Sequence, residues 1–198
     1  MAERMMRDKK RIIVGASGAS GFPVLKKCLE LIREDRTYQS GLIMSRNADL
    51  TLKAEMGETP ESFGNLADLV FDSEDIAAGP ASGTWRNTGM LIAPCSMKTL
   101  AGIHAGLSDN LLLRAADVTM KEHRTLVLGV RETPLGPVHL RNMYEMSMMP
   151  EVRIVPLMMS FYFRPETIDE MVFHMAAKLL EPFGIDVPDF HRWKEEDD

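Results

Sequence analysis

Short apolar runs alternate with longer amphipathic segments along most of the sequence, and this order limits the fold more than any other feature. The run Arg11-Ile12-Ile13-Val14 stops at Gly15, and a helical pattern follows over 23–33. The same change of period predicts further strands over 41–44, 69–71, 90–93, 125–130 and 152–155, and further helices over 48–56, 97–105, 109–123, 138–149 and 166–183. Strands that alternate with helices predict an α/β fold, with a parallel sheet between two layers of helices.

The chain of 198 residues has the length of one domain. We assign residues 11–185 to that domain, residues 1–10 to an N-terminal extension and residues 186–198 to a C-terminal tail. The tail ends in Lys194-Glu195-Glu196-Asp197-Asp198, a charged run that favours solvent. No repeat, low-complexity tract or linker divides the chain.

The charge balance and the cysteine count exclude several classes of partner and site. The 23 Lys and Arg residues against 29 Asp and Glu residues give a formal net charge of −6. Nucleic acids and anionic membranes attract basic surfaces, so we expect neither as a partner. No apolar run approaches the roughly 18 residues of a membrane span. The two cysteines lack the spacing of a zinc or disulfide framework, which favours a reducing, cytoplasmic location.

Ligands of open α/β sheets bind beyond the carboxyl ends of the strands. The predicted strands here are followed by glycines, hydroxyls or charges, which in chain order are Gly15-Ala16-Ser17-Gly18-Ala19-Ser20-Gly21, Ser45-Arg46, Pro94-Cys95-Ser96, Arg131-Glu132-Thr133-Pro134 and Ser160-Phe161-Tyr162. We therefore expect the functional site at this edge of the sheet.

The loop after the first strand has the properties of a phosphate cradle. Its glycines let a ligand approach the backbone, and the following helix presents its N-terminus to an anion. Ser17 adds a hydroxyl. The spacing is GxxGxxG, which is neither GxGxxG nor a P-loop, so no nucleotide fingerprint applies. A tight strand-to-helix turn explains the same residues equally well.

Three cations form a second candidate for anion binding. Arg114 and Lys121 are seven residues apart, and so lie on nearly the same face of the helix predicted over 109–123. Arg131 follows the next strand, and the three cations would make an anion site if they met at one sheet edge. Alternatively, Lys121 forms a surface ion pair with Asp117. Glu132 is either an acid or base with a tuned pKa or a salt-bridge partner of Arg131.

The other reactive side chains have simple structural explanations. The five histidines lack metal-ligand spacing, so we expect no metal site. Cys95 could be a nucleophile, but a small buried residue explains Pro-Cys-Ser at a strand end better. Many of the 16 methionines lie from Met143 to Met159, where they fit a core or a subunit contact better than a cofactor site.

Several long motifs follow one another in a distinctive order: Gly15-Ala-Ser-Gly-Ala, Pro94-Cys-Ser-Met-Lys-Thr-Leu-Ala-Gly-Ile, Asp109-Asn-Leu-Leu-Leu-Arg-Ala-Ala-Asp-Val-Thr-Met-Lys-Glu, Leu126-Val-Leu-Gly-Val-Arg-Glu-Thr-Pro-Leu, His139-Leu-Arg-Asn-Met and Phe161-Tyr162. Together they resemble the flavin prenyltransferase family, the UbiX-type proteins also described as aromatic acid decarboxylase subunits. The resemblance extends over nearly the whole chain, from about residue 12 to residue 184.

The resemblance implies a flavodoxin-like, Rossmann-like three-layer fold that assembles as a homododecamer. It implies a metal-independent enzyme that joins the dimethylallyl group of dimethylallyl phosphate to reduced FMN, at N5 and then at C6. The product, prenylated FMN, is the cofactor of UbiD-type decarboxylases, which are therefore the expected recipients.

The resemblance also implies roles for residues by position. The residues expected to bind FMN are Gly15, Ala16, Ser17, Ser45, Ser82, Ser96 and Arg114. The residues expected to bind the prenyl phosphate are Lys121, Arg131, Tyr162 and Lys178. Glu55 and Glu132 correspond to acids near the reacting flavin, and Glu132 is the better candidate for proton transfer. Ser17 is the third candidate catalytic residue.

Four departures from the family pattern accompany these assignments. Gly21-Phe22-Pro23 reverses the usual aromatic–glycine order after the first loop, and Lys178 replaces an arginine, which removes a bidentate donor. Met149-Pro150-Glu151-Val152 replaces a glycine–alanine step before the last strand. Met159 stands in place of a proline just before Phe161-Tyr162, so the shape of the prenyl site is expected to differ there.

Two other functions fit the same sequence. The protein could bind FMN or deliver it to a decarboxylase without catalysis. It could also be an FMN-dependent cysteine decarboxylase of the same superfamily, although Ala81-Ser82-Gly83-Thr84-Trp85 occupies the region where those enzymes carry an asparagine motif.

Overall fold

A computed structural model of the chain describes residues 9–193. Its centre is a sheet of six parallel strands in the order β3-β2-β1-β4-β5-β6. The strands are β1 (Lys10–Ala16), β2 (Tyr38–Met44), β3 (Leu69–Phe71), β4 (Gly89–Cys95), β5 (Thr125–Val130) and β6 (Val152–Ile154). This is the Rossmann order, in which the topological switch point lies between the carboxyl ends of β1 and β4. The predicted α/β fold with a parallel sheet is confirmed.

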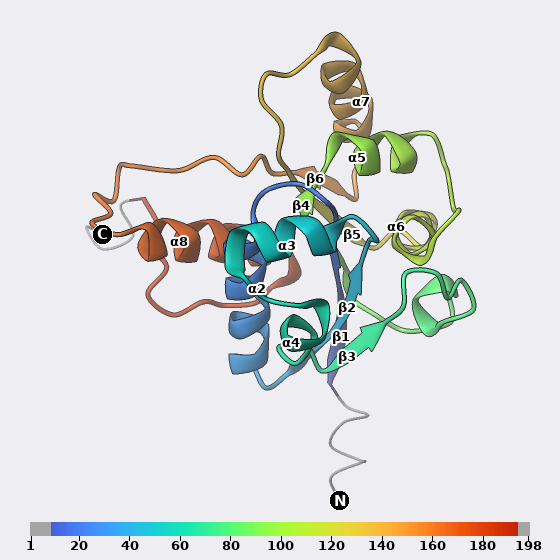
Figure 1. Ribbon diagram of the computed structural model, residues 1–198, viewed down its shortest axis with the longest axis horizontal. Helices are drawn as coiled ribbons and strands as arrows, with labels where there is room; N and C mark the ends of the chain where they lie inside the picture. The colour runs from blue at the N-terminus through green and yellow to red at the C-terminus, as the bar shows by residue number, and fades with distance from the viewer. Residues whose placement is uncertain (1–8, 194–198) are drawn as a thin grey trace, which may run out of the picture.

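Helices cover both faces of the sheet (Figure 1). One face carries α2 (Phe22–Glu34) and α8 (Ile168–Leu180), and the other carries α5 (Met97–His104) and α6 (Leu111–Lys121). The three layers expected from the alternating pattern are therefore present.

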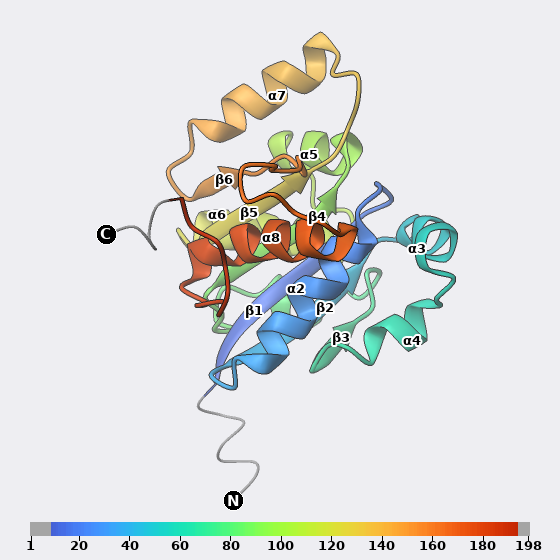
Figure 2. The ribbon, with the colours of Figure 1, turned by 90° about the vertical axis from the view of Figure 1, so that its left-hand side faces the viewer.

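The remaining helices lie around the margins of the sheet. α3 (Ala48–Met56) and α4 (Pro60–Gly64) connect β2 to β3, and α7 (Pro137–Ser147) stands away from the sheet (Figure 2). Two short 3-10 turns are η1 (Gly79–Ala81) and η2 (Glu181–Phe183). Among the described residues, no helix combines the length and apolarity needed to cross a lipid bilayer.

The two helix layers have separate hydrophobic cores because neighbouring strand residues point to opposite faces. In β1, Ile12 and Val14 pack in the core that includes α2 and α8, whereas Ile13 packs in the core that includes α5 and α6. All three side chains are fully buried. Burial on both faces explains why the central strands appear in the sequence as continuous apolar runs.

Two helices differ from the sequence prediction for local reasons. The helix predicted over 166–183 ends at Leu180 and continues as η2, because Pro182 has no N–H to extend the helical hydrogen bonds. The periodicity does not predict α4, since five residues are too few to establish a period. Thr59 begins that helix by accepting the N–H of Ser62 at 3.3 Å.

The described part of the predicted tail packs on the domain. Val187 is buried, and the Phe190 ring lies 4.9 Å from the His174 ring on α8. Trp193 contacts Tyr162 edge to face, with ring centroids 5.4 Å apart. Residues 187–193 thus form a segment that lies against α8, whereas the charged end of the predicted tail falls outside the described residues.

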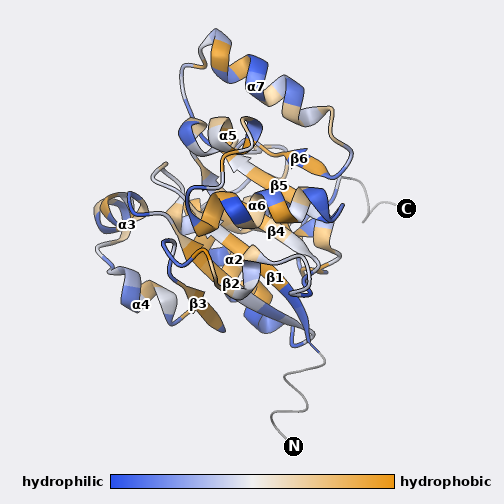
Figure 3. Ribbon diagram, turned by 90° about the vertical axis from the view of Figure 1, so that its right-hand side faces the viewer, coloured by the Kyte–Doolittle hydropathy of each residue, from blue (hydrophilic) through white to orange (hydrophobic). Residues whose placement is uncertain are grey.

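α7 and the segments before and after β6 carry large apolar side chains that this chain leaves exposed. In Figure 3, α7 carries hydrophobic residues among hydrophilic ones. We call these residues the α7 surface: Val138, Leu140, Tyr144, Met148, Met149, Met158, Met159 and Phe161. The helix is held to α5 by a hydrogen bond between His104 Nε2 and Glu145 Oε2 at 2.5 Å. Of the methionines in this region, Met146 is fully buried and the four in the α7 surface are not.

Candidate active site

A hollow of about 310 Å³ opens at the carboxyl ends of β1 and β4, where the sheet has its switch point. We call it the switch-point hollow. Its polar lining includes Ser17, Ser45, Asn47, Ser96, Thr99 and Asn110, which come from the ends of β1, β2 and β4 and from the start of α6. The expectation of a site at this edge agrees with the position of the hollow, which brings together the predicted residues Ser17, Ser45 and Ser96.

The hydroxyl of Ser17 ties the loops after β1 and β4 together. Its Oγ donates to the carbonyl of Pro94 at 2.9 Å and accepts the N–H of Ser96 at 2.8 Å. Ser17 is almost fully buried. The single hydroxyl proton is therefore engaged within the chain, and the main effect of Ser17 here is to fix the wall of the hollow.

The close packing around Gly15, at the base of this wall, leaves no room for a side chain. A Cβ on Gly15 would lie 2.5 Å from Cδ1 of Leu112, the second residue of α6. The absence of a side chain lets α6 approach β1 and brings the N-terminus of α6 to the hollow. Gly15 thus shapes the wall of the hollow through packing, and its predicted contact with FMN remains a prediction.

The carboxylate of Glu55, on α3, binds the end of the first loop. Glu55 Oε2 accepts the N–H of Gly21 at 3.0 Å and the N–H of Phe22 at 2.9 Å. These are unpaired donors at the N-terminus of α2, where a negative charge is favourable. Gly21 has a φ of +136°, a conformation that glycine adopts readily and other residues avoid. Glu55 therefore positions the first loop, and its predicted role beside the reacting flavin remains a prediction.

Three helix N-termini meet at the switch-point hollow. Asn47 precedes α3, Ser96 precedes α5 and Asn110 precedes α6, and all three line the hollow. Ser96 and Asn110 accept backbone N–H groups of their own helices, at 3.3 Å from Thr99 and 3.0 Å from Leu113. Partial positive charge from the helix dipoles is therefore directed at one point, which favours an anion.

Two cations that the sequence analysis did not select also line the hollow. Arg46 follows β2, and Lys98 lies in the first turn of α5. Within residues 9–193, neither side chain has a hydrogen-bond or ion-pair partner, so both charges are available to a ligand. In the sequence, Arg46 directly follows its strand and Lys98 lies within the motif that begins at Pro94, but neither position alone assigns a role as a ligand.

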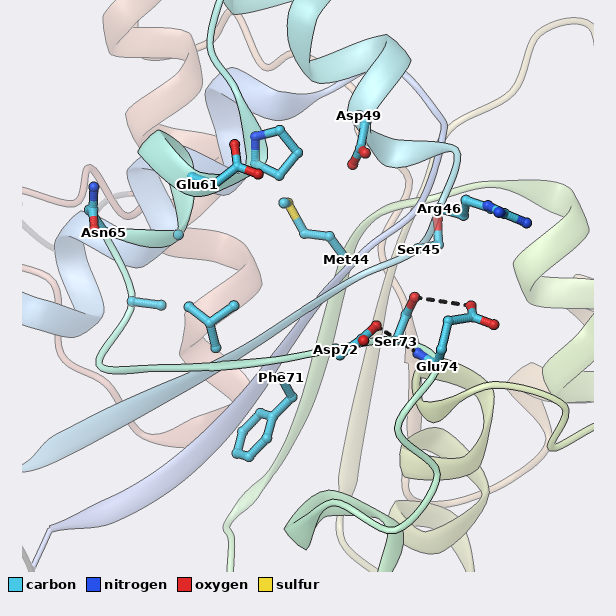
Figure 4. Close-up of a pocket in the computed structure, with 14 residues that line it drawn as sticks. Met44, Ser45, Arg46, Asp49, Glu61, Asn65, Phe71, Asp72, Ser73 and Glu74 are labelled. Carbon is cyan, nitrogen blue, oxygen red and sulfur yellow. Dashed lines mark hydrogen bonds between the residues drawn. The ribbon is translucent and has the colours of Figure 1, made fainter.

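A larger hollow of about 810 Å³ adjoins the first and shares Ser45, Arg46, Ser73 and Glu74 with it (Figure 4). Its other charged lining residues are Asp49, Glu61 and Asp72. In Figure 4 the Arg46 side chain points away from Asp49 and Glu61. The larger hollow is lined by four carboxylates and the switch-point hollow by Glu74 alone, so a phosphate meets less repulsion in the smaller, switch-point hollow.

Arg131 and Glu132 follow β5 at the same edge of the sheet. The N–H of Arg131 donates to the carbonyl of Cys95 at 3.1 Å, which places it next to the wall formed by Ser96. The Arg131 side chain is exposed, and it has no ion-pair or hydrogen-bond partner in the described part of the chain. Glu132 Oε1 accepts only the N–H of Thr133, at 3.0 Å. A free cation and a free acid therefore stand beside the hollow.

Ser82 and Arg114 lie close together on the side of α6 that carries η1. Arg114 Nε donates to the carbonyl of Ala81 at 3.2 Å, and Arg114 Nη1 pairs with Asp117 at 2.7 Å. The Ser82 hydroxyl lies 2.9 Å from that of Thr84. Neither Ser82 nor Arg114 lines the switch-point hollow of this chain.

Lys121 lies at the far end of α6 from the hollow, so the expected meeting of Arg114, Lys121 and Arg131 does not occur within one chain. The axis of α6 separates Leu111 from Lys121 by about 15 Å, because each residue adds roughly 1.5 Å. Arg131 is at the carboxyl end of β5, whereas Lys121 lies just before its amino end. Lys121 pairs instead with Glu122 at 2.7 Å, and this hydrogen bond and charge lower the pKa of Glu122.

Tyr162 and Lys178 are associated with α8. The Tyr162 hydroxyl lies 3.3 Å from Nε2 of His174, and the ring is half exposed. Lys178 pairs with Glu181 at 2.6 Å. It lines a shallow hollow with Thr125 and Val152, the first residues of β5 and β6, and so lies toward the amino ends of the strands. One chain therefore does not gather the four predicted phosphate ligands.

Cys95 has the properties of a core residue. It is fully buried, and burial raises the pKa of its thiol to about 12, so the nucleophilic thiolate is scarce at neutral pH. Among the described residues, no group of three or more His, Cys, Asp or Glu side chains is arranged to hold a metal ion.

The chemistry of the switch-point hollow fits FMN. A phosphate needs cations and backbone donors, which Arg46, Lys98 and the three helix N-termini supply. A flavin ring needs hydrogen-bond partners for its carbonyl oxygens and ring nitrogens, which the hydroxyl and amide lining offers.

Comparison with known proteins identifies close relatives over nearly the full length. The Flavoprotein family model matches residues 1–173. The flavin prenyltransferase UbiX of Neisseria meningitidis serogroup B is 45% identical over 185 residues, which cover 93% of this chain and 97% of that protein. The flavin prenyltransferase UbiX of Escherichia coli K12 is 42% identical over 187 residues, with 93% and 98% coverage.

Solved structures give the same result. A crystal structure of AnUbiX (PadA1) in complex with FMN and dimethylallyl pyrophosphate has a TM-score of 0.90 at 40% identity, over 93% of this chain and 97% of that one. A dodecameric FMN-dependent UbiX-like decarboxylase from Escherichia coli O157:H7 has a TM-score of 0.90 at 44% identity, with 92% and 98% coverage. The peptidyl-cysteine decarboxylase EpiD shares the fold alone, at 13% identity and a TM-score of 0.61. The chain therefore belongs to the flavoprotein family and, within it, to the UbiX-like flavin prenyltransferases.

Proposed function

We propose that the protein makes prenylated FMN from reduced FMN and dimethylallyl phosphate. The allylic carbon–oxygen bond of the donor breaks, one new bond forms at flavin N5 and a second forms at C6. The flavin loses the protons of N5 and C6. One proton is transferred to the alkene of the prenyl group, and the other leaves with inorganic phosphate.

One observation supports this proposal above all others. In a chain that belongs to the UbiX-like flavin prenyltransferases, the switch-point hollow combines three helix N-termini with the unpartnered cations Arg46 and Lys98. Such a hollow suits the phosphate of a flavin mononucleotide. The hydroxyls of Ser45 and Ser96 are placed to meet the rest of the flavin, and Ser17, Gly15 and Ala16 hold the wall in position.

The donor phosphate needs a separate set of cations, and we assign Arg131 as its principal ligand. Arg131 is free and lies beside the hollow. As the allylic bond breaks, negative charge grows on the departing phosphate, and a fixed guanidinium stabilises that charge. Glu132, next to Arg131, is the group we assign to the proton transfers.

The remaining assigned residues meet the donor or the flavin in an assembly of several copies. Lys121, Ser82 and Arg114 lie outside the switch-point hollow of their own chain, so they reach a site only if another copy packs against α6. The α7 surface gives such copies an apolar contact. A site closed between copies also keeps water away from the allylic cation. We propose a homododecamer, the assembly of the Escherichia coli O157:H7 relative.

The product is released to a second protein in this proposal. Prenylated FMN is a cofactor rather than an end product, so we propose a UbiD-type decarboxylase as recipient. We propose the cytoplasm as the site of the reaction, since both Cys28 and Cys95 are free thiols in the structure.

The test is an anaerobic incubation of the protein with reduced FMN and a prenyl donor, followed by the mass of the released flavin. We expect a gain of one C5H8 unit. Parallel reactions with dimethylallyl monophosphate and dimethylallyl diphosphate identify the donor that reacts. Flavin that binds tightly but gains no mass with either donor would show that the protein is a carrier and not a transferase.

A further inference from the structure

Rings from two separate segments gather around His174, in the middle of α8. Phe163, in the turn after β6, stacks on the His174 ring with centroids 4.4 Å apart and planes 11° apart. Phe190, in the 187–193 segment, covers the ring from another side at 4.9 Å. His174 is buried, and a buried polar ring needs hydrogen-bond partners. The position therefore needs an explanation beyond packing.

The polar atoms of His174 face both of these segments. Nε2 lies 3.3 Å from the Tyr162 hydroxyl, and the ring also forms a hydrogen bond with the backbone of His191. A neutral imidazole has one acceptor and one donor. With Tyr162 as the donor to Nε2, the ring N–H remains for the carbonyl of His191, so both atoms of the neutral ring are used.

The surroundings favour the neutral form of the ring. Burial lowers the pKa of His174 below its usual value, and the charges of His191 and Lys178 lower it further. The hydrogen bond to the backbone of His191 raises the pKa of His174, but its effect is smaller than the effect of burial. A neutral ring can accept the Tyr162 proton, whereas a protonated ring could not.

Tyr162 itself has an exposed ring, and its hydroxyl contacts the His174 ring. Its ring is 53% exposed and touches Trp193 and His174 edge to face. The 3.3 Å separation is longer than the roughly 2.8 Å of a strong hydroxyl hydrogen bond, so the proton can turn to another acceptor. His174 thus sets the position of the oxygen without holding its proton tightly.

We propose that His174 is a positioning residue for the prenyl donor, which fixes the Tyr162 hydroxyl and ties the turn 161–164 to the segment 187–193. This inference rests on the proposed function, in which Tyr162 meets the donor phosphate. His174 touches neither flavin nor donor, and it acts through Tyr162. The C-terminal segment is then part of the donor site, because its backbone completes the hydrogen bonding of the residue that holds Tyr162.

Two matched substitutions separate the polar role of His174 from its packing. His174→Phe keeps a ring between Phe163 and Phe190 but removes both hydrogen bonds. We expect the KM for dimethylallyl phosphate to rise about fivefold, the loss typical of one such bond, with kcat and FMN affinity near the wild-type values. His174→Gln offers an amide oxygen to Tyr162 and an N–H to His191, and it should restore most of the loss.

A double substitution tests whether His174 acts through Tyr162. In a Tyr162→Phe background, His174→Phe should cause no further rise in KM, because the hydroxyl that it positions is gone. If His174→Phe raises the KM by the same factor in both backgrounds, the two residues act independently and the proposal is wrong.

Hydrogen–deuterium exchange on the FMN-loaded protein without donor distinguishes this proposal from the proposed function. We expect His174→Phe to speed exchange in peptides covering 161–164 and 187–193, and His174→Gln to return it toward the wild-type rate. That pattern in a protein that transfers no prenyl group would support the tie and overturn the function. Unchanged exchange in His174→Phe would overturn the tie, whether or not prenyl transfer occurs.

Discussion

The switch-point hollow and the outer side of α6 contain residues that family resemblance assigns to one site, but only the hollow is assembled by a single chain. In the hollow, Ser17 and Ser96 are joined by a hydrogen bond of 2.8 Å. On α6, Arg114 and Lys121 are directed to Asp117 and Glu122, and Lys121 lies near the amino edge of the sheet.

The difference shows which part of the site the fold alone can build. Parallel strands bring every carboxyl end to one edge, so residues that follow strands meet whatever else the chain does. A residue at the C-terminal end of a helix, such as Lys121, lies near the amino ends of the strands. In the proposal it meets the residues that follow the strands only across a contact between copies. In the proposal, the flavin half of the site around the hollow therefore lies within one chain, except for Ser82 and Arg114, and the donor half, which combines Arg131 with Lys121, is complete only in the assembly.

The strongest test of this comparison mixes two inactive variants. Arg131→Ala and Lys121→Ala should each lose most prenyl transfer. When the two proteins are unfolded together and reassembled in equal amounts, about one quarter of the shared sites should carry both native residues and recover activity. The measurement is the rate of prenylated FMN formation per site.

The control for this experiment is each variant unfolded and reassembled alone. If mixing restores nothing while both controls reassemble to the native size, then Arg131 and Lys121 act in the site of the same copy, and the division between the two regions is wrong.

The second prediction concerns the flavin half. Arg46→Ala combined with Lys98→Ala should raise the Kd for FMN about 10- to 100-fold, because two charge-assisted contacts to phosphate are lost. Flavin fluorescence on titration gives the Kd. Lys53 is an exposed lysine on α3, the helix that follows Arg46, and Lys53→Ala should leave the Kd unchanged. An equal effect of Lys53→Ala would indicate a general charge effect instead of a phosphate contact.

The third prediction tests the wall of the hollow. Ser17→Ala removes two buried hydrogen bonds and leaves the carbonyl of Pro94 and the N–H of Ser96 without them, so the free energy of unfolding should fall by about 1–3 kcal/mol. Urea unfolding at fixed protein concentration measures it. Ser20→Ala, in the same loop but half-exposed, is the control, and equal losses would mean that the Ser17 link contributes nothing special.

The smallest predicted effect concerns Lys178, which is held by Glu181 in this chain. If Lys178 contributes to the donor phosphate across a contact, Glu181→Gln frees its charge and should lower the KM for dimethylallyl phosphate about twofold, in the range of an exposed ion pair. The KM of this variant is compared with the KM of Lys178→Ala. No change in either variant would remove Lys178 from the donor half.

The fold was largely predictable because the strands and most helices have clear periods. For example, Ile12, Ile13 and Val14 are a continuous apolar, β-branched run, and they form a buried strand. α4 was missed because a five-residue helix that depends on its Thr59 cap has no period of its own. The packing of residues 187–193 was also missed, since Val187, Phe190 and Trp193 are separated by polar residues and proline and follow no helical or strand period.

The site was predictable in its place but not in its assembly. Ser45 and Ser96 could be identified as hydroxyls after strands, and the hollow contains both. Helical spacing placed Arg114 and Lys121 on one face, but spacing says nothing about which end of the helix lies near the sheet edge. Arg46 and Lys98 received no role from the sequence because single cations near strand ends are common, and their lack of partners within residues 9–193 is visible only in the structure.

The α7 surface contains four exposed methionines, so the rate at which their thioethers are oxidised would report whether this surface is covered by another copy. Met148 and Met158 are 68% and 66% exposed in a single chain, so peroxide would reach both thioethers in a dissociated protomer. Conversion to the polar sulfoxide would then hinder reassociation of an apolar contact. A protein that loses its neighbours under oxidative stress would therefore keep a flavin hollow but remain unable to rebuild the half of the site that accepts the donor.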